Sequence, residues 1–285
     1  MESAEERTKS VGRELLERGR IRGLLALISD KSGVRPGFLQ KPEEVSSLVL
    51  APRYLLAPLV RTLQAVDSKA TLGVVARGCD ERALVEMAKA GQVDIQRVVL
   101  VGLACDEETA RQCGCTRPYP RKIDVGEKVD RIGGTELSGE TMVHRGKQIN
   151  WTAELARCLK CYGCRNACPL CVCPECKIGL DMWVQTGVLP PDPLSFHLIR
   201  AFHLADKCID CGSCQDACPA GIPLRKLHQH LLKVLEERLA YVPGLDENQQ
   251  SPLFTDLKQA PFCGPEVPRW VSTLGANEQG ELKGE

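Results

Sequence analysis

The sequence predicts two structural parts: an α/β domain with a small parallel sheet covered by helices, followed by an all-α region. In the first half of the chain, short apolar runs alternate with helical stretches, a pattern typical of parallel sheets buried on both faces. In the second half, two dense cysteine motifs are each embedded in helical sequence. At 285 residues the chain is long enough for two domains with cores of their own.

We divide the chain into four expected segments. They are an N-terminal helix and connection (1–42), an α/β cysteine-containing domain (43–150), a helical region with two cysteine motifs (151–243) and an extended C-terminal arm (244–285). The arm holds several prolines and glycines and few apolar periods, so we expect it to lie against this protein or a partner.

Hydrophobic periodicity predicts the elements of the first half. Residues 11–28 carry apolar side chains at three- and four-residue steps, which predicts an amphipathic helix. Expected strands and helices then alternate, with strands beginning at Val45, Leu72 and Arg97 and helices over 54–65 and 81–90. Residues 116–150 follow no clear period and favour a connection that contains a hairpin.

In the second half, helical stretches flank the cysteine motifs. The stretch WTAELAR precedes Cys158, DPLSFHLIRAFHLADK precedes Cys208, and PLRKLHQHLLKVLEERLA follows Cys218. Their apolar residues recur at helical spacing. Any metal or cluster held by these motifs is therefore expected to lie among helices.

The charge balance argues against two classes of partner. Lysine plus arginine and aspartate plus glutamate number 37 each, so the formal net charge is zero and no global field attracts nucleic acid. The first twenty residues are charged and polar, unlike a secretory signal, and no apolar run approaches membrane-spanning length. We expect a cytoplasmic protein that neither binds nucleic acid nor inserts into a membrane.

The chain has 16 cysteines and an aromatic content of only 4%. Thiols stay reduced in the cytoplasm, so metal or cluster ligation is expected in place of a disulfide framework. Because large aromatic side chains are scarce, we expect the clusters to replace part of the core.

The two cysteine motifs have the same spacing, CLKCYGCRNACP and CIDCGSCQDACP. This is the spacing of bacterial [4Fe-4S] ferredoxins, in which the fourth cysteine ligates the other cluster. The sequence therefore predicts two clusters. The expected ligands are Cys158, Cys161, Cys164 and Cys218 for the first, and Cys208, Cys211, Cys214 and Cys168 for the second.

Zinc is the alternative to clusters at these motifs. Structural zinc is normally held by two separated CxxC pairs, whereas each motif here holds four cysteines in one run closed by proline. The spacing favours clusters. Neither expected cluster has an open coordination position, which is typical of electron transfer and not of catalysis.

The segment LCVCPEC directly follows the first motif and adds Cys171, Cys173 and Cys176. Three thiols within six residues indicate a further site, for zinc or another cluster, with Cys263 as a candidate fourth ligand. The alternative is that these are reduced thiols packed beside the clusters, because cysteine often serves as a small buried hydrophobe.

Four cysteines of the first domain are expected at one edge of the sheet. Cys79 and Cys105 each follow an expected strand, and Cys113 and Cys115 come shortly after. Ligands of open α/β sheets sit at the carboxyl ends of the strands. A third [4Fe-4S] cluster is the leading hypothesis, with structural thiols or zinc as alternatives.

The helical region resembles the α-helical ferredoxin domains of heterodisulfide reductase and succinate dehydrogenase iron–sulfur subunits. The resemblance rests on the long insertion between Cys168 and Cys208 and on CGSCQDACPAGIP running into a helix. It implies a fold of an α/β domain followed by an α-helical ferredoxin domain.

A second resemblance begins at GCDERALVEMAKAGQVDIQRVVLVGLACDEE, followed by CGCTRPYP. These segments resemble the β subunits of deazaflavin-coenzyme-reducing hydrogenases and formate dehydrogenases. With the cysteine motifs after them, residues 45–243 resemble bacterial proteins described as formate dehydrogenase β subunits. Carried over, the family's cluster ligands in the first domain are Cys79, Cys105, Cys113 and Cys115.

The resemblance implies an electron-transfer subunit of a multisubunit oxidoreductase of the formate dehydrogenase, hydrogenase or heterodisulfide reductase type. Its partners would be a catalytic dehydrogenase or hydrogenase subunit and a flavin or heterodisulfide-reductase-like subunit. The alternative is a flavin-bearing subunit that exchanges hydride with a nicotinamide or deazaflavin. The chain has no GxGxxG segment and little room for a flavin pocket, so FAD stays an alternative that we do not expect.

Overall fold

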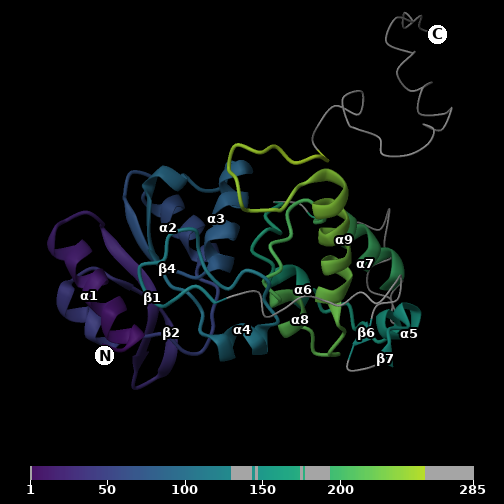
Figure 1. Ribbon diagram of the computed structural model, residues 1–285, viewed down its shortest axis with the longest axis horizontal. Helices are drawn as coiled ribbons and strands as arrows, with labels where there is room; N and C mark the ends of the chain where they lie inside the picture. The colour runs from purple at the N-terminus through teal and green to yellow at the C-terminus, as the bar shows by residue number, and fades with distance from the viewer. Residues whose placement is uncertain (1, 130–142, 145–146, 174–175, 177–192, 254–285) are drawn as a thin grey trace, which may run out of the picture.

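A computed structural model shows the α/β part and the helical part of the chain lying side by side (Figure 1). It describes residues 2–129, 143–144, 147–173, 176 and 193–253. The elements of the α/β part are α1 (Ala4–Glu17), β1 (Gly23–Asp30), β2 (Gly33–Leu39), β3 (Leu48–Val49), α2 (Ala57–Val66), β4 (Leu72–Ala76), α3 (Gly78–Lys89), β5 (Val98–Gly102) and α4 (Glu107–Cys113).

The sheet is mixed, not purely parallel as the sequence predicts. Its strand order is β2-β1-β4-β5, with β3 also paired to β1. The pairs β1/β4 and β4/β5 are parallel, whereas β2 and β3 pair antiparallel with β1. The difference arises because β1 and β2 form a hairpin that sequence periodicity does not reveal.

The predicted helix over 11–28 is wrong in its second half. Helix α1 begins after the Ser3 cap, whose side chain accepts from the backbone N–H of Glu6 at 3.1 Å, and it ends at Glu17. The apolar run from Gly23 to Ile28 is strand β1, buried on both faces. A short run that is apolar throughout has no period to separate a buried strand from a buried helix.

The strand expected from Val45 is also shorter than predicted, because residues 42–47 form a 3-10 helix and only Leu48–Val49 pair as β3. The other predicted elements of this part are present as α2, β4, α3 and β5. The hairpin expected within 116–150 is present as β6 (Val143–His144) and β7 (Lys147–Gln148).

Helices cover both faces of the sheet. Leu25 and Val74 face α2 and α3, where Val60 and Leu84 complete one apolar core. Helix α1 covers the opposite face, over a second core. The first core also takes in Leu204 and other apolar residues of the helical part. The two parts therefore share one hydrophobic core.

The helical part consists of α5 (Trp151–Ala156), α6 (Gly163–Asn166), α7 (Pro193–His203), α8 (Ser213–Asp216) and α9 (Leu224–Leu239). Helices α5, α7 and α9 are the three that the sequence predicts around the motifs. Leu155, Phe196 and Leu224, one from each, meet in a small apolar cluster with Cys164. Among the described residues, no helix is both long and apolar enough to span a membrane.

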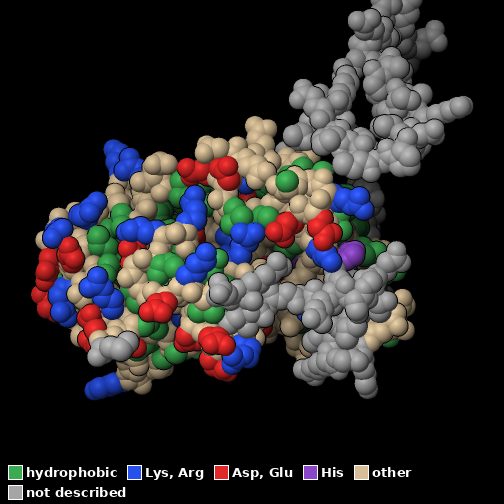
Figure 2. Space-filling model, in the orientation of Figure 1, with side chains coloured by type: hydrophobic (Ala, Val, Ile, Leu, Met, Phe, Trp, Pro, Cys, Tyr) green, Lys and Arg blue, Asp and Glu red, His purple; other side chains and the backbone are tan. Residues whose placement is uncertain are grey.

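The segment after α9 folds back onto α3. The hydroxyl of Tyr241 donates to the carbonyl oxygen of Asp206 at 3.1 Å, and the N–H of Gly244 donates to the Glu86 carboxylate at 2.7 Å. Of the expected arm 244–285, residues 244–253 contain no helix or strand, and the rest lies outside the described residues. Figure 2 shows charges of both signs interspersed over the visible face, in keeping with the zero net charge.

Asp80 joins the starts of α2 and α3. Its side chain is 0% exposed and accepts from the backbone N–H groups of Leu56 at 2.6 Å, Ala57 at 3.0 Å and Arg77 at 3.1 Å. Burial is the main cause that raises the pKa of this carboxyl, against those three hydrogen bonds. Removal of the carboxylate would leave the N–H groups of Leu56 and Ala57 buried without this partner.

We therefore expect Asp80→Ala to lower the free energy of unfolding by about 3 kcal/mol, measured by urea denaturation under far-UV circular dichroism. The matched control is Asp67→Ala. Asp67 is exposed and also accepts from backbone N–H groups, of Lys69 and Ala70, both at 3.2 Å. Water replaces its hydrogen bonds, so a change of less than about 1 kcal/mol is expected. Equal losses in both variants would contradict the role of buried donors.

Candidate metal centres

Three enclosed cavities are each lined by four of the cysteines that the sequence groups together. The inner cavity lies in the α/β part and is lined by Cys79, Cys105, Cys113 and Cys115. The middle cavity is lined by Cys168, Cys208, Cys211 and Cys214. The outer cavity is lined by Cys158, Cys161, Cys164 and Cys218. They are similar in size, with 320 to 400 Å³ of empty space each.

The inner cavity lies at the carboxyl ends of the parallel strands β4 and β5. Cys79 stands in the first turn of α3 after β4, and Cys105 follows β5. The N–H of Cys105 donates to the carbonyl oxygen of Pro118 at 2.8 Å, which draws the segment after Cys115 across the cavity. Strands that run in the same direction bring their ends to one edge, which is why cysteines distant in sequence meet here.

Two thiols of the inner cavity interact directly. The Cys115 thiol donates to Cys113, and this hydrogen bond lowers the pKa of Cys113 to about 5, with Arg225 and Arg53 assisting. The same bond raises the pKa of Cys115, and burial raises that of Cys79 to about 12. Metal coordination would deprotonate all of these thiols.

The two motifs follow the same backbone path around the other cavities. In each motif the second and fourth residues after the first cysteine are left-handed: Lys160 and Tyr162 have φ of 50° and 59°, and Asp210 and Gly212 have 55° and 81°. This path turns three successive cysteines toward one point. The N–H of Lys160 also lies 3.3 Å from the Cys158 sulfur, a contact that favours a thiolate.

The fourth cysteine of each motif crosses to the other cavity. Cys168 follows α6 and lines the middle cavity, while Cys218 follows α8 and lines the outer one. The crossing brings α6 and α8 close together: a Cβ on Gly163 would lie 2.8 Å from the carbonyl oxygen of Ala217. Glycine at that position of the first motif permits this approach.

The inner and middle cavities share a wall, and one side chain links the middle cavity to the outer one. Cys211 lines both the inner and the middle cavity. Between the middle and outer cavities stands Arg200, which lines the former and donates to the carbonyl oxygen of Cys164 at 2.8 Å. The order along the molecule is therefore inner, middle, outer.

The donor sets fit [4Fe-4S] clusters. Four thiolates are the usual ligands of such a cluster, and here they face a cavity from separate directions. Within the described residues, no three Cys, His, Asp or Glu side chains converge closely enough to hold a single metal ion. The cations Arg53, Arg200 and Arg225 also line these cavities, and they suit a group of net negative charge.

Among the described residues, the remaining cysteines Cys171, Cys173 and Cys176 do not converge on a site for a single metal ion. Cys171 accepts a hydrogen bond from Cys168, which lowers the pKa of Cys171 to about 6, and Arg200 lies 3.9 Å from its sulfur. Cys176 packs with the apolar cluster around the outer cavity, and exposed Cys173 lies 3.9 Å from His203 Nε2. Cys263 lies outside the described residues.

Two histidines, which the sequence suggests as surface or cluster-neighbour residues, also line the cavities. His197 lines the outer cavity and His228 the middle one. Burial lowers the pKa of His197 to about 4 and that of His228 to about 3, so both imidazoles are neutral. Their sequence signal is weak because each lies on an amphipathic helix with a second histidine nearby.

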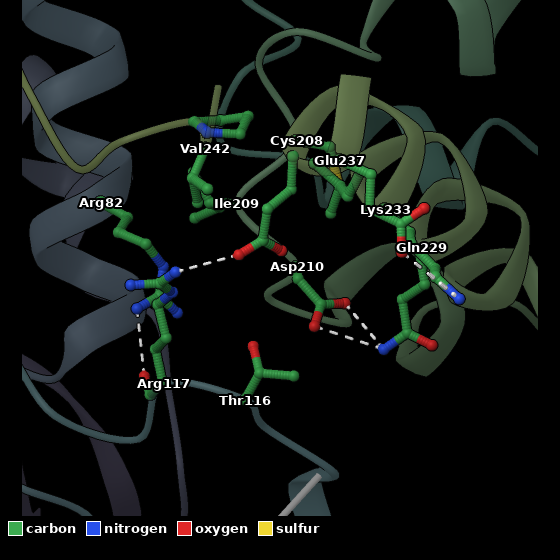
Figure 3. A pocket seen from close by; sticks show the side chains of 13 residues that line it. Arg82, Thr116, Arg117, Cys208, Ile209, Asp210, Gln229, Lys233, Glu237 and Val242 are labelled. Atoms are coloured by element: carbon green, nitrogen blue, oxygen red, sulfur yellow. Dashed lines mark hydrogen bonds and ion pairs between the residues drawn. The ribbon is translucent and has the colours of Figure 1, made fainter. Parts of the chain in front are cut away.

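A wider cleft separates α3 from α9 (Figure 3). Its volume is about 550 Å³, with Arg82 and Arg117 on one side and Asp210 and Lys233 on the other. Cys208 contributes to its wall. The cleft therefore reaches a cysteine of the middle cavity from the outside.

Comparison with known proteins points to iron–sulfur chemistry. Residues 200–220, which include the second cysteine motif, match the family described as "4Fe-4S binding domain". The second cysteine motif is therefore similar to a 4Fe-4S binding domain.

Two curated relatives are β subunits. The chain is 45% identical over 142 residues to the "F420-dependent formate dehydrogenase subunit beta" of Methanocaldococcus jannaschii, a match covering 48% of this chain and 37% of the relative. It is 25% identical over 351 aligned positions to the "F420-dependent formate dehydrogenase 1 subunit beta" of Methanococcus maripaludis, covering 82% and 89%. The match thus spans little more than a third of the first relative.

Gly78 is required where α3 passes the segment that carries the last inner cysteine. A Cβ there would overlap the carbonyl oxygen of Tyr119 and lie 2.9 Å from that of Arg117. Both obstacles are backbone and cannot rotate away. Gly78→Ala should therefore displace this segment and open the inner cavity.

The measurement for Gly78→Ala is iron content per chain, expected to fall by about four atoms, one cluster's worth. Gly91→Ala is the control: its φ of 64° costs stability on substitution, but no heavy atom lies within 4 Å of the added carbon. The control should keep its iron. Full iron in Gly78→Ala would contradict the steric argument.

Proposed function

We propose that this chain is the iron–sulfur electron-transfer subunit of a multisubunit oxidoreductase of the formate dehydrogenase type. The observation that carries the proposal is a set of three neighbouring cavities, each lined by one of the predicted sets of four cysteines. The match of residues 200–220 and the names of the two relatives support it. A hydrogenase or heterodisulfide reductase type of complex has the same requirement for a relay.

Each cavity is assigned one [4Fe-4S] cluster. The proposed ligands are Cys79, Cys105, Cys113 and Cys115 for the inner cluster, Cys168, Cys208, Cys211 and Cys214 for the middle cluster, and Cys158, Cys161, Cys164 and Cys218 for the outer cluster. Interleaved ligands from the two motifs also support an α-helical ferredoxin domain for the second part.

When bound, the clusters supply one-electron redox chemistry. The chain contributes ligands, spacing and shielding from water. Cys211 lies on the wall of both the inner and the middle cavity. The two proposed cluster sites are therefore neighbours, with this residue between them. With four thiols at each cavity, no coordination position is left for a substrate, so the chain relays electrons and leaves catalysis to another subunit.

The partners in this proposal are a catalytic dehydrogenase or hydrogenase subunit and a flavin or heterodisulfide-reductase-like subunit. One partner would exchange electrons with the inner cluster and another with the outer cluster. Cys161, which lines the outer cavity, is exposed, and this supports docking of a partner at that end. Charges of both signs on the surface support docking by local complementarity.

A flavin-bearing subunit is the second candidate, and the cleft between α3 and α9 favours it. The cleft offers Arg82, Arg117 and Lys233 as cations for phosphate and reaches the middle cavity at Cys208. Acid extraction of the purified protein separates the two candidates: one flavin per chain would favour this one and contradict a relay made of clusters alone.

The first prediction of the relay concerns stoichiometry. Anaerobically purified protein should contain about twelve irons and twelve acid-labile sulfides per chain, since each of three clusters holds four. About eight would mean that only two cavities are filled. A colourless protein with zinc and no sulfide would refute the proposal.

The second prediction concerns the inner cluster. Cys79→Ser should remove about four irons and leave the other two clusters, because the middle and outer cavities take their thiols from other segments. Cys173→Ser is the matched control, since Cys173 is exposed and lines none of the three cavities. Retention of all iron in Cys79→Ser would exclude this residue as a ligand.

A further inference from the structure

Arg200 is a buried cation at the junction of two proposed clusters. It lies on α7, is 3% exposed and lines the middle cavity. Its Nη2 donates to the carbonyl oxygen of Cys164 at 2.8 Å and lies 3.9 Å from the Cys171 sulfur. Its Nη1 lies 3.2 Å from Nε2 of His228. None of these neighbours is a carboxylate.

Arg225 lines the same cavity and provides the contrast. Its guanidinium forms an ion pair with Asp210, with contacts of 2.6 and 2.9 Å. Among the described residues, Arg200 has no such ion pair. A buried charge without a counter-ion is costly. Within the described residues, the groups that can balance the charge of Arg200 are thus thiolates, such as Cys171 at 3.9 Å, and any anionic group held in the middle cavity.

His228 adds a buried donor to the same cavity. It lies on α9, is 4% exposed and lines the middle cavity. A guanidinium can only donate, so Nε2 of His228 accepts from Arg200, and the neutral ring carries its proton on Nδ1. In the described part of the chain, Nδ1 has no hydrogen-bond partner. A buried N–H without an acceptor is rare and indicates a missing acceptor.

We propose that Arg200 and His228 together set the reduction potential of the middle cluster, an inference that rests on the proposed relay. Arg200 supplies a fixed positive charge and holds His228 in the tautomer whose Nδ1–H donates to a sulfur of the cluster. Both interactions stabilise the reduced form, which carries one more negative charge. The potential of a cluster held in the middle cavity would thereby be raised.

The test is a redox titration of the full-length, cluster-loaded protein, followed by electron paramagnetic resonance. Arg200→Gln and His228→Leu should each lower the potential of one cluster. Arg200→Lys keeps the charge and should stay close to the wild-type potential. His228→Asn keeps an N–H donor near the position of Nδ1 and should recover part of the shift.

Two further measurements identify the cluster and the donor. The shift should persist when inner or outer ligands are removed by Cys79→Ser or Cys161→Ser, because neither variant removes the middle cluster. Hyperfine spectroscopy of the reduced middle cluster should detect an exchangeable proton that His228→Leu abolishes. His197→Phe, at the outer cavity, is the control and should leave that proton in place.

The outcomes separate this inference from the relay itself. If all twelve irons are present but neither Arg200→Gln nor His228→Leu lowers a potential, the inference is overturned and the relay stands. An equal shift in Arg200→Lys and Arg200→Gln also overturns it, because charge would then not be the cause. If Arg200→Gln loses iron, its potential no longer tests the inference. The potential of His228→Leu and the hyperfine signal then decide whether the inference holds. A wild-type protein without a middle cluster refutes the relay.

Discussion

Two arginine side chains form hydrogen bonds between the α/β part and the helical part, and these bonds hold the walls of the inner and middle cavities together. Arg53 donates to the carbonyl oxygen of Cys211 at 3.0 Å and pairs with Asp216 at 2.8 Å. Arg225 donates to the carbonyl oxygen of Cys113 and pairs with Asp210. Charge-assisted bonds of this kind fix direction as well as distance. The shared wall at Cys211, and with it the continuity of the proposed relay, depends on them.

The cavities also take the place of part of a hydrophobic core. Aromatic residues are only 4% of the chain, and the apolar cluster among α5, α7 and α9 is small. Thiols buried around a cavity add little packing by themselves, and burial raises the pKa of Cys79 to about 12 and that of Cys214 to about 12. Because metal binding deprotonates and bridges thiols, the proposed relay implies that folding of the helical part would be coupled to cluster loading.

The two arginines that line the middle cavity differ in their charge compensation. At the boundary between inner and middle cavities, Arg225 is neutralised by Asp210. At the boundary between middle and outer cavities, Arg200 faces a neutral His228. A fixed cation acts on reduction potential only where no anion cancels it. The middle cavity thus has one lining arginine without a carboxylate partner among the described residues, and it is also the cavity that the cleft reaches at Cys208.

Local sequence alone determined the cysteine motifs, helices α7 and α9, and the strand ends that carry Cys79 and Cys105, because these depend on spacing within short segments. It did not determine strand β1, since a run buried on both faces carries no period. Nor did it reveal Arg200, whose partners Cys164 and His228 lie 36 and 28 residues away. Only tertiary packing decides which buried cation lacks a counter-ion, because charge compensation depends on distance in space and not along the chain.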